Sequence, residues 1–215
     1  MDKRIVIFAN GDVDPQALES IRQDDFILCA DGGALNAVRL GLTPDVVLGD
    51  FDSLSDEILE DFRQQGITIV KYPIEKDKTD LELAMDYAID MGTNEIMVFT
   101  ALGGRMDQML GNVLLATHDK YRSARIIFIS GSQTGFILRD EDKLEHYGMS
   151  GDILSVIPLS LKVHIKALHG VVWPIDQQVL EFGSSLSLSN RFAENVVNIA
   201  VKEGICLVVH IPDEH

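Results

Sequence analysis

Short hydrophobic runs recur through the first 130 residues, and a polar turn follows each of them. The runs are rich in β-branched residues and apolar on both faces, which is typical of parallel strands that are covered on both sides. Amphipathic stretches separate several of the runs. The pattern therefore predicts a parallel sheet with flanking helices, with strands at Arg4–Ala9, Asp25–Ala30, Asp45–Leu48, Ile67–Lys71, Glu95–Thr100 and Arg125–Ser130.

The clearest helical pattern covers Asp80–Met91. Thr79 and Glu82 fit a capping box at its start, and Gly92 supplies a stop at its end. One apolar face is formed at helical spacing by Leu81, Ala84, Met85, Ala88 and Ile89.

Two further helices are expected in the same region. One runs from Asp107 to about Thr117 and is predicted to bury Leu110, Val113 and Leu114. A weaker one follows Gly33 and stops at Gly41.

After Ser130 the helical periodicity fades, and short alternating segments separated by Gly, Ser, Pro and Asp follow. We expect strands at Ile153–Ile157, Leu161–Ala167, Ser185–Ser189, Val196–Val201 and Ile205–Val209. The prediction is an α/β chain in two domains. Residues 1–132 form a Rossmann-like parallel sheet with helices, and residues 140–215 form a smaller all-β domain of the sandwich or jelly-roll type.

Composition narrows the classes of function. The net charge is −16, and residues 1–124, with 11 basic and 23 acidic side chains, carry most of it. A nucleic-acid partner is not expected, because the sequence has no basic stripe. No apolar run has the length of a membrane span or of a signal peptide, and Cys29 and Cys206 lie within apolar runs as buried thiols. We therefore expect a cytoplasmic protein.

Four acidic stretches are the main candidates for chemistry. Each follows a predicted strand, and in an open parallel sheet the carboxyl ends of the strands meet at one edge, where ligands bind. Carboxylates gathered there repel one another unless a cation neutralises them, and Mg²⁺ shared with substrate phosphates suits such oxygen donors. The stretches are 30–33 (ADGG), 49–53 (GDFDS), 76–80 (KDKTD) and 103–107 (GGRMD).

Two of these stretches offer metal ligands. Asp50 and Asp52 are two residues apart, so in an extended backbone their carboxylates point to the same side. The alternative is a polar turn in which Ser53 or Ser55 caps the next helix. Asp80 stands at the first helical position, where the helix dipole alone also favours a carboxylate.

The glycine turn at Gly103 and Gly104 leads into a helix start. Its backbone N–H groups can approach a phosphate, and the guanidinium of Arg105 can grip one. Such turns also serve for chain reversal alone, and the same alternative applies to Gly32 and Gly33 after Asp31. The six histidines lack metal-ligand spacing, and the sequence shows no Gly-x-Ser-x-Gly or Cys-x-x-Cys motif.

Taken in order, the acidic stretches resemble the thiamine pyrophosphokinase (thiamin diphosphokinase) family. Residues 168–175 (LHGVVWPI) look like the Leu-x-Gly-x-x-Trp segment of that family. Gly183 and residues 187–190 (SLSN) resemble its Gly…Ser-x-Ser-Asn segment. The resemblance covers nearly the whole chain.

The resemblance implies a homodimer that transfers the β,γ-pyrophosphoryl group of ATP to the hydroxyl of thiamine and releases AMP. It implies that Asp50, Asp52 and Asp80 hold Mg²⁺ and that Ser187, Ser189 and Asn190 face thiamine across the dimer interface. The alternation of Leu186 and Leu188 with the serines predicts a strand that buries the leucines and presents the serines. By the same resemblance, the nucleotide site comprises Asp31, Gly32, Gly33, Gly103, Gly104, Arg105, Asp107 and Gln108.

Catalysis by such an enzyme rests on alignment and charge neutralisation, with Asp80, Arg105 and Asp107 as the catalytic candidates. Asp80 or Asp107 would accept the proton of the thiamine hydroxyl, and the sequence leaves the choice open. Gln108 departs from the histidine that many bacterial members carry, and a glutamine cannot take a proton near neutral pH. Two alternatives use the same acidic edge: a Mg²⁺-dependent nucleotide phosphohydrolase and a non-catalytic nucleotide-binding sensor.

Overall fold

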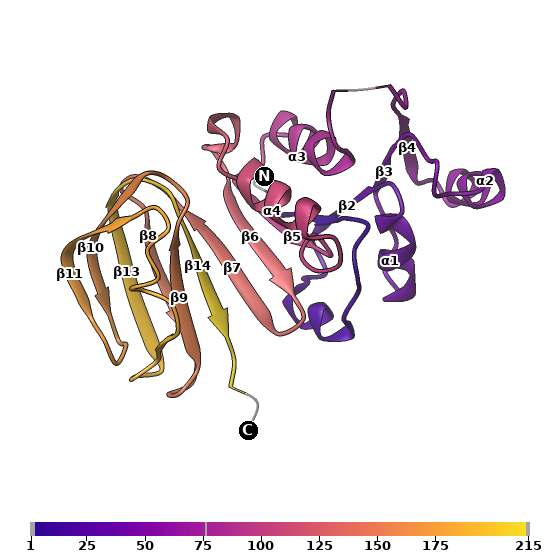
Figure 1. Cartoon of the computed structure of the whole chain (residues 1–215). Helices are drawn as coiled ribbons and strands as arrows, with labels where there is room; N and C mark the ends of the chain where they lie inside the picture. The colour runs from indigo at the N-terminus through magenta and orange to yellow at the C-terminus, as the bar shows by residue number, and fades with distance from the viewer. Residues whose placement is uncertain (1–2, 76, 214–215) are drawn as a thin grey trace. The chain divides into compact units, whose positions relative to one another are not determined.

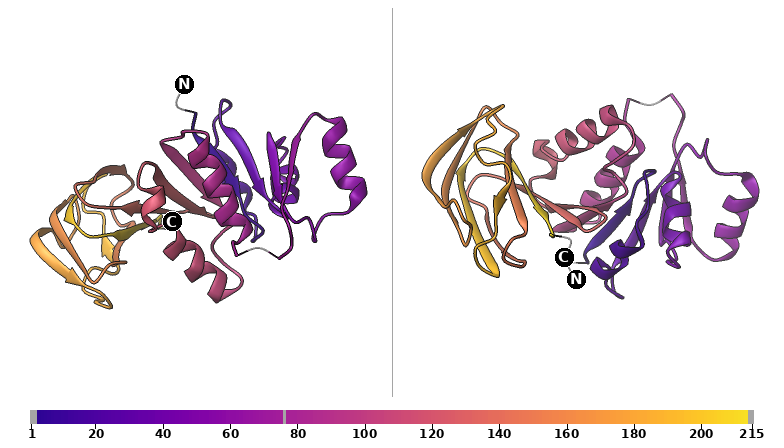
Figure 2. Two further views of the ribbon diagram at one scale, coloured as in Figure 1. Left: turned by 90° about the horizontal axis from the view of Figure 1, so that it is seen from above. Right: turned by 60° about the horizontal axis from the view of Figure 1, so that its bottom comes forward.

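The computed structural model describes residues 3–75 and 77–213, so Lys76 of the third acidic stretch lies outside the described residues. The chain divides into two compact units, an N-terminal unit that ends at Gly131 and a C-terminal unit that begins at Ser132. The strands β1 to β6 belong to the first unit and the strands β7 to β14 to the second (Figures 1 and 2).

The N-terminal unit is built on parallel strands in the order β4-β3-β2-β1-β5-β6. Every strand predicted for this region is confirmed, with ends that shift by a residue or so. The order reverses between β1 and β5, and such a switch point opens a crevice at the carboxyl edge of a parallel sheet. The strands are β1 (Ile5–Phe8), β2 (Phe26–Ala30), β3 (Val46–Gly49), β4 (Thr68–Lys71), β5 (Glu95–Phe99) and β6 (Arg125–Ser130).

The core of this unit lies on both faces of the central strands. Leu28 and Cys29 point to opposite faces of β2, yet both are fully buried. The helices α1 (Gly33–Arg39) and α3 (Asp80–Asp90) both pack on β1 and β2. The outermost strand, β4, differs from the prediction of a strand buried on both faces, because it is paired only on its β3 side and its ends are exposed.

Side-chain caps mark where two helices of this unit, α2 and α3, begin. In α3 the Thr79 side chain accepts a hydrogen bond from the Glu82 N–H, which confirms the predicted cap. In α2 (Asp56–Gln64) the Ser55 side chain accepts from the Ile58 N–H. Two short 3₁₀ turns complete the unit, at Pro15–Ser20 and Asp119–Tyr121.

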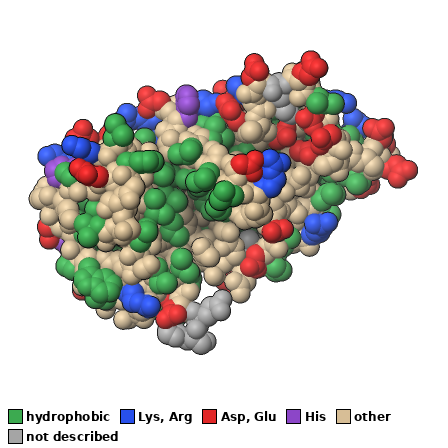
Figure 3. All heavy atoms as spheres, in the orientation of Figure 1, with side chains coloured by type: hydrophobic (Ala, Val, Ile, Leu, Met, Phe, Trp, Pro, Cys, Tyr) green, Lys and Arg blue, Asp and Glu red, His purple; other side chains and the backbone are tan. Residues whose placement is uncertain are grey.

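The helix α4 (Met106–Leu115) forms close to its predicted place but not with its predicted packing. Leu110 and Leu114 are 54% and 50% exposed, and no residue of α4 is buried. The expectation that this helix buries Leu110, Val113 and Leu114 was wrong. Met106, Leu110 and Leu114 form an exposed apolar stripe on α4, and Figure 3 shows hydrophobic side chains gathered on the face where this helix lies.

The C-terminal unit consists of antiparallel strands in two sets, β7-β14-β9-β12 and β11-β10-β13-β8. The strands predicted near residues 153, 161, 196 and 205 are confirmed as β9, β10, β13 and β14. The strands are β7 (Gln133–Leu138), β8 (Lys143–Tyr147), β9 (Ile153–Pro158), β10 (Lys162–His169), β11 (Ile175–Glu181), β12 (Asn190–Arg191), β13 (Val196–Glu203) and β14 (Cys206–Ile211).

The strand expected at Ser185–Ser189 is wrong. The segment is a series of turns, and its burial is the reverse of the prediction: Leu186 and Leu188 are exposed, whereas Ser187 is buried. The Ser187 hydroxyl donates a hydrogen bond to the Val156 carbonyl, which explains why a serine tolerates burial here.

Within the described part of the chain, none of the helices has the length and apolar character that crossing a membrane requires.

Candidate active site

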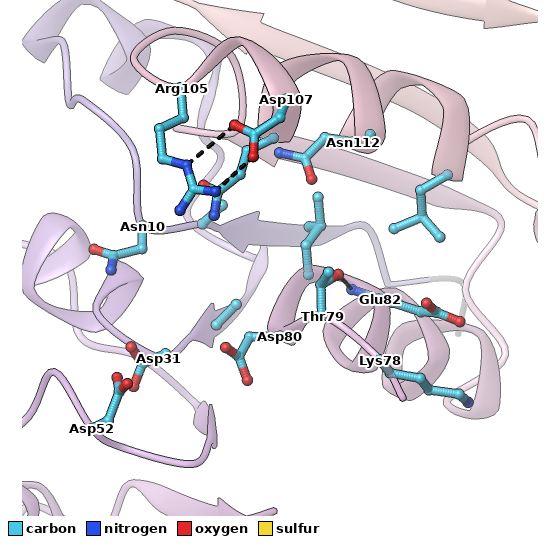
Figure 4. Close-up of a pocket in the computed structure, with 16 residues that line it drawn as sticks. Asn10, Asp31, Asp52, Lys78, Thr79, Asp80, Glu82, Arg105, Asp107 and Asn112 are labelled. Atoms are coloured by element: carbon cyan, nitrogen blue, oxygen red, sulfur yellow. Dashed lines mark hydrogen bonds and ion pairs between the residues drawn. The ribbon is translucent and has the colours of Figure 1, made fainter. Parts of the chain in front are cut away.

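A cavity of about 760 Å³ opens in the N-terminal unit at the carboxyl edge of the sheet. It is lined from β1 and β2 by the residues that end these strands, from α3 by its first turn and from α4 by one face of the helix (Figure 4). The lining residues are Ala9, Asn10, Ala30, Asp31, Asp52, Lys78, Thr79, Asp80, Leu81, Glu82, Arg105, Asp107, Gln108, Gly111, Asn112 and Leu115.

Three carboxylates form a cluster at this edge. Asp31, Asp50 and Asp52 each offer an oxygen within 4.8 Å of the others. They follow β2 and β3, which are neighbouring parallel strands. Like charges this close repel one another, so a bound divalent cation would lower the free energy of the cluster.

Asp31 shows most clearly that the cluster has unused ligand capacity. Its side chain is buried, and its Oδ2 accepts a hydrogen bond of 2.5 Å from the Ser53 hydroxyl. Its Oδ1 is buried without a hydrogen-bond partner among the described residues. A buried carboxylate oxygen left this way is costly, and a hard cation is the kind of partner that would satisfy it. The donor set therefore fits a Mg²⁺ ion.

The backbone is also unusual at this edge. Asp31 and Phe51 have φ values of 46° and 65°, and Thr100, directly after β5, has 56°. A bulky residue such as Phe51 rarely adopts a positive φ, and such backbone strain concentrates at functional sites. The turn around Phe51 carries Asp50 and Asp52 on either side.

Asp80 lies on the same cavity but outside the carboxylate cluster. It begins α3 and is half-buried. In Figure 4 its carboxylate is directed toward the side of the cavity that holds Asp31 and Asp52. The structure thus groups Asp50 and Asp52 with Asp31, whereas the sequence grouped them with Asp80.

Arg105 and Asp107 form an ion pair at the start of α4. The Arg105 guanidinium donates to both oxygens of Asp107, from Nε at 3.1 Å and from Nη2 at 2.6 Å. This pairing lowers the pKa of the Asp107 carboxyl and raises the pKa of Arg105. Both side chains are about two-thirds exposed, so Arg105 can turn from Asp107 toward a ligand at little cost.

The predicted glycines take different places. Gly32 and Gly33 are buried and do not line the cavity, and a side chain at Gly33 would collide with the Phe8 carbonyl. Gly103 and Gly104 are exposed, with φ values of 107° and 69° that favour glycine. They place Arg105 at the cavity without lining it themselves. Gln108 lines the cavity from α4.

Polar groups that no sequence motif had indicated brace the edge. Asn36 donates to the carbonyls of Ala9 and Gly11, and Asn112 donates to the Ala101 carbonyl. Asn10 lines the cavity itself. A signal for Asn10 was present, since Asn10-Gly11 follows the first strand as the acidic stretches follow theirs.

A second cation of the cavity, Lys78, is held by a carboxylate on α3. Its Nζ lies 2.7 Å from Asp86 Oδ2, while Asp86 Oδ1 receives Lys120 at 2.8 Å and the Tyr121 hydroxyl at 2.9 Å. Burial raises the pKa of Asp86, but the donors Lys120, Lys78 and Tyr121 outweigh it, so the pKa lies below its usual range. Both oxygens of Asp86 therefore accept from donors of neighbouring side chains.

The predicted thiamine residues of the C-terminal unit serve first as internal braces. The Asn190 side chain accepts from the Trp173 and Arg191 N–H groups and donates to the Trp173 carbonyl. Ser187 is bonded to Val156, as described above. Ser189 is exposed, and Trp173, which Asn190 holds, is 61% exposed.

Comparisons with known proteins agree across both units. Residues 17–128 match the family model described as thiamin pyrophosphokinase, catalytic domain, and residues 140–206 match the one described as thiamin pyrophosphokinase, vitamin B1 binding domain. A thiamine pyrophosphokinase of Bacillus subtilis is 28% identical over 195 residues, covering 85% of this chain and 86% of the relative.

Solved structures show the same likeness. The thiamin pyrophosphokinase of Geobacillus thermodenitrificans superposes with a TM-score of 0.83 at 27% identity over 98% of both chains. A Bacillus subtilis thiamine pyrophosphokinase structure gives 0.86 at 24% identity over 99% of this chain and 100% of its own, which shows a shared fold.

The α/β fold, the acidic edge and these likenesses together define an ATP-dependent transferase. The first family model alone spans more than half of the sequence. The chain belongs to the thiamin pyrophosphokinase family. It is accordingly an enzyme of thiamine diphosphate formation with ATP as co-substrate.

Proposed function

We propose that the carboxyl edge of the N-terminal unit binds Mg²⁺–ATP and transfers its β,γ-pyrophosphoryl group to the hydroxyl of thiamine. The observation that carries this proposal is the cluster of Asp31, Asp50 and Asp52, in which the buried Oδ1 of Asp31 has no hydrogen-bond partner among residues 3–75 and 77–213. Asp50 and Asp52 would hold the ion, with Asp31 from the neighbouring strand and Asp80 from α3 on the adjoining wall of the cavity. When bound, Mg²⁺ neutralises charge on the polyphosphate.

The start of α4 is proposed to bind the transferred group. Its backbone N–H groups and helix dipole favour an anion, and Arg105 precedes them with five donors in a planar fork. A polyphosphate would compete with Asp107 for the guanidinium. Arg105 then stabilises the negative charge that develops in the transition state. Gly103 and Gly104 give the turn its shape, and Gln108 and Asp31 complete the nucleotide site.

We propose that Asp80, rather than Asp107, accepts the proton of the thiamine hydroxyl. Asp107 accepts two hydrogen bonds from Arg105, and this pairing lowers its pKa, which makes it a weak proton acceptor while the pair is intact. Asp80 directs its carboxylate into the cavity. Asp107 then acts by setting the resting position of Arg105.

Thiamine is proposed to bind on the surface formed by Trp173, before β11, and the turn between β11 and β12 of the C-terminal unit. Its cationic thiazolium ring would suit the exposed face of Trp173. Ser189 offers an exposed hydroxyl, while Ser187 and Asn190 fix the shape of this surface through their internal hydrogen bonds.

We propose that the enzyme is a homodimer whose active sites are shared between subunits. Two exposed apolar surfaces support an association: the α4 stripe of Met106, Leu110 and Leu114, and the turn that carries Leu186 and Leu188. Exposed apolar patches of this kind are typical of interaction sites. The strand order of the N-terminal unit supports the Rossmann-like description, and the buried free thiols suit a reducing cytoplasm.

The decisive experiment is incubation with ATP and Mg²⁺, with and without thiamine, followed by separation of the products. We expect AMP and thiamine diphosphate in equal amounts, and no AMP without thiamine. AMP formation without thiamine would identify the phosphohydrolase alternative, and ATP binding without any turnover would identify a sensor.

Mixed dimers test the sharing of sites. Inactive Asp80→Ala subunits are exchanged with inactive Trp173→Ala subunits. If each site takes Asp80 from one subunit and Trp173 from the other, every mixed dimer has one intact site, and about a quarter of wild-type activity returns under random pairing. No recovery after verified exchange would show that both residues serve the same subunit's site.

A further inference from the structure

A buried hydrogen-bond chain crosses between the two sets of strands in the C-terminal unit. His146 on β8 shares a hydrogen bond of 2.9 Å from Nε2 to Nδ1 of His210 on β14. His210 Nε2 in turn lies 2.9 Å from Asp152 Oδ2. Asp152 and His210 are 2% and 7% exposed, and none of the three residues has a role in the function proposed above.

The carboxylate fixes where the protons of this chain lie. Burial raises the pKa of Asp152, but the N–H groups of Met149 and Asp213 and the His210 ring outweigh it, so the pKa lies below its usual range. An ionised carboxylate only accepts, so His210 carries its proton on Nε2. The other ring nitrogen of His210, Nδ1, shares the second hydrogen bond of the chain with Nε2 of His146.

The hydrogen-bond chain is connected through the backbone of Asp152 to Phe192, two residues after the Asn190 that holds Trp173. The Asp152 carbonyl accepts from the Phe192 N–H, and the Phe192 carbonyl accepts from the Gly151 N–H, both at 2.9 Å. The buried Phe192 ring packs 5.0 Å from the His210 ring.

Phe192 ends the short segment that begins at Asn190. The carbonyl of Arg191 in this segment accepts a hydrogen bond from the Val172 N–H. The Asn190 side chain is hydrogen-bonded to both the N–H and the carbonyl of Trp173. A displacement of Asp152 or His210 would therefore reach Trp173 through two short hydrogen-bonded steps.

We propose that Asp152, His210 and His146 are positioning residues for thiamine: they hold the segment 190–192, and through it the exposed ring of Trp173, in the orientation that thiamine binds. This inference rests on the proposed thiamine surface and deepens it. The groups themselves do not contact the substrate. Their effect falls on thiamine binding and leaves the nucleotide site in the other unit unchanged.

The test compares two aspartate–histidine pairs of the same unit. Asp152→Asn removes the carboxylate charge and one acceptor at the buried pair. Asp176→Asn makes the same change at His169, where the distance is also 2.9 Å but the side chains are 56% and 68% exposed. Trp173 is the only tryptophan of the sequence, so its fluorescence reports thiamine binding without turnover.

For Asp152→Asn we expect the thiamine KM and the thiamine Kd from Trp173 fluorescence to rise about tenfold, because small misplacements of binding groups weaken productive contacts strongly. The KM for ATP and kcat at saturating thiamine should stay within about twofold. Asp176→Asn should leave all values unchanged. In wild type, ¹⁵N spectra of the ring nitrogens should show His210 protonated on Nε2, the nitrogen that faces Asp152.

Several results would overturn the proposal. Unchanged thiamine binding in folded Asp152→Asn would do so, as would equal losses in thiamine KM, ATP KM and kcat, which indicate a general structural role. If Asp152→Asn does not fold, His146→Phe decides, because it keeps a ring beside Phe136 and Phe192 and removes the hydrogen bond to His210. A wild-type enzyme that forms no thiamine diphosphate would refute the proposed function, while the Nε2 proton of His210 would still test the chain.

Discussion

The carboxyl edge of the N-terminal unit and the turn around Asn190 in the C-terminal unit both carry the polar residues singled out from the sequence, but their hydrogen-bonding capacity is used differently. At the edge, Asp31 keeps a buried oxygen without a partner among the described residues, and three carboxylates crowd together. At the turn, the side chains of Ser187 and Asn190 are hydrogen-bonded to the backbone of neighbouring residues.

This difference assigns different tasks to the two regions. The unsatisfied oxygen of Asp31 and the repulsion among the three carboxylates lower the stability of the free protein, and a cation relieves both, so the edge binds through charge. Saturated side chains cannot bind a ligand strongly themselves, but they fix the surface around them. Substitutions at the edge should therefore impair activity, and substitutions at the turn should impair stability.

The largest effect is expected at Asp52. Asp52→Asn keeps the shape but removes one charge from the cluster, and we expect kcat/KM to fall about 100-fold or more, the scale of one strong electrostatic contact in a transition state. The free energy of unfolding should stay the same or rise, because repulsion is relieved. Steady-state kinetics and urea unfolding measure the two quantities. A variant that keeps wild-type turnover would remove Asp52 from the site.

At the turn around Asn190, a substitution is expected to lower stability, whereas at the edge it lowers activity. Asn190→Ala leaves the N–H groups of Trp173 and Arg191 and the Trp173 carbonyl without their partner, and should lower the free energy of unfolding by about 1–3 kcal/mol. Exposed Ser189→Ala is the matched control and should change stability by less than about 0.5 kcal/mol. Equal stabilities of the two variants in urea would contradict the bracing role.

The order of elements could be predicted because local signals agree with one another. Thr79, Glu82 and Gly92 mark both ends of α3, and the strand runs before the acidic stretches are all found. The packing of α4 could not be predicted in this way. Helical periodicity identifies an apolar stripe but not what covers it, and Leu110 and Leu114 remain exposed.

The strand predicted at residues 185–189 was wrong for a related reason. Leucine and serine alternate there as in a strand, but Ser189 adopts a φ of 55° and Ser187 finds a buried carbonyl. Alternation alone does not show which face is buried when a polar side chain has a specific partner. At the edge, the sequence could place Asp31, Asp50 and Asp52 on neighbouring strand ends, but not show that Asp31 rather than Asp80 completes the cluster.

Arg105 tests the edge with a smaller change. Arg105→Lys keeps the charge but loses the planar fork, so we expect kcat/KM for ATP to fall about tenfold, the scale of one hydrogen bond to a charged group. The melting temperature should hardly change, because the Arg105–Asp107 pair is exposed. Unchanged kinetics would make Arg105 an ordinary surface residue of a glycine turn.

The smallest effect is expected at Asp86. Both oxygens of this carboxylate have donors, as at the turn around Asn190, but Asp86 lies in the same unit as the acidic edge. Asp86→Asn should leave kcat/KM within about threefold and lower the free energy of unfolding by about 1 kcal/mol, since its lysine partners are partly exposed.

The folded-state pKa of Asp86 lies below the unfolded value, so its stabilising contribution is present above about pH 4 and disappears as the pH falls through the folded pKa. The gap in melting temperature between wild type and variant should therefore be constant from pH 7 to about pH 5 and narrow toward pH 3. If the difference in melting temperature instead widened as the pH falls, the Asp86 carboxylate would not be stabilised by Lys78, Lys120 and Tyr121. Hydrogen-bonding partners would then not distinguish Asp86 from the clustered carboxylates of the edge.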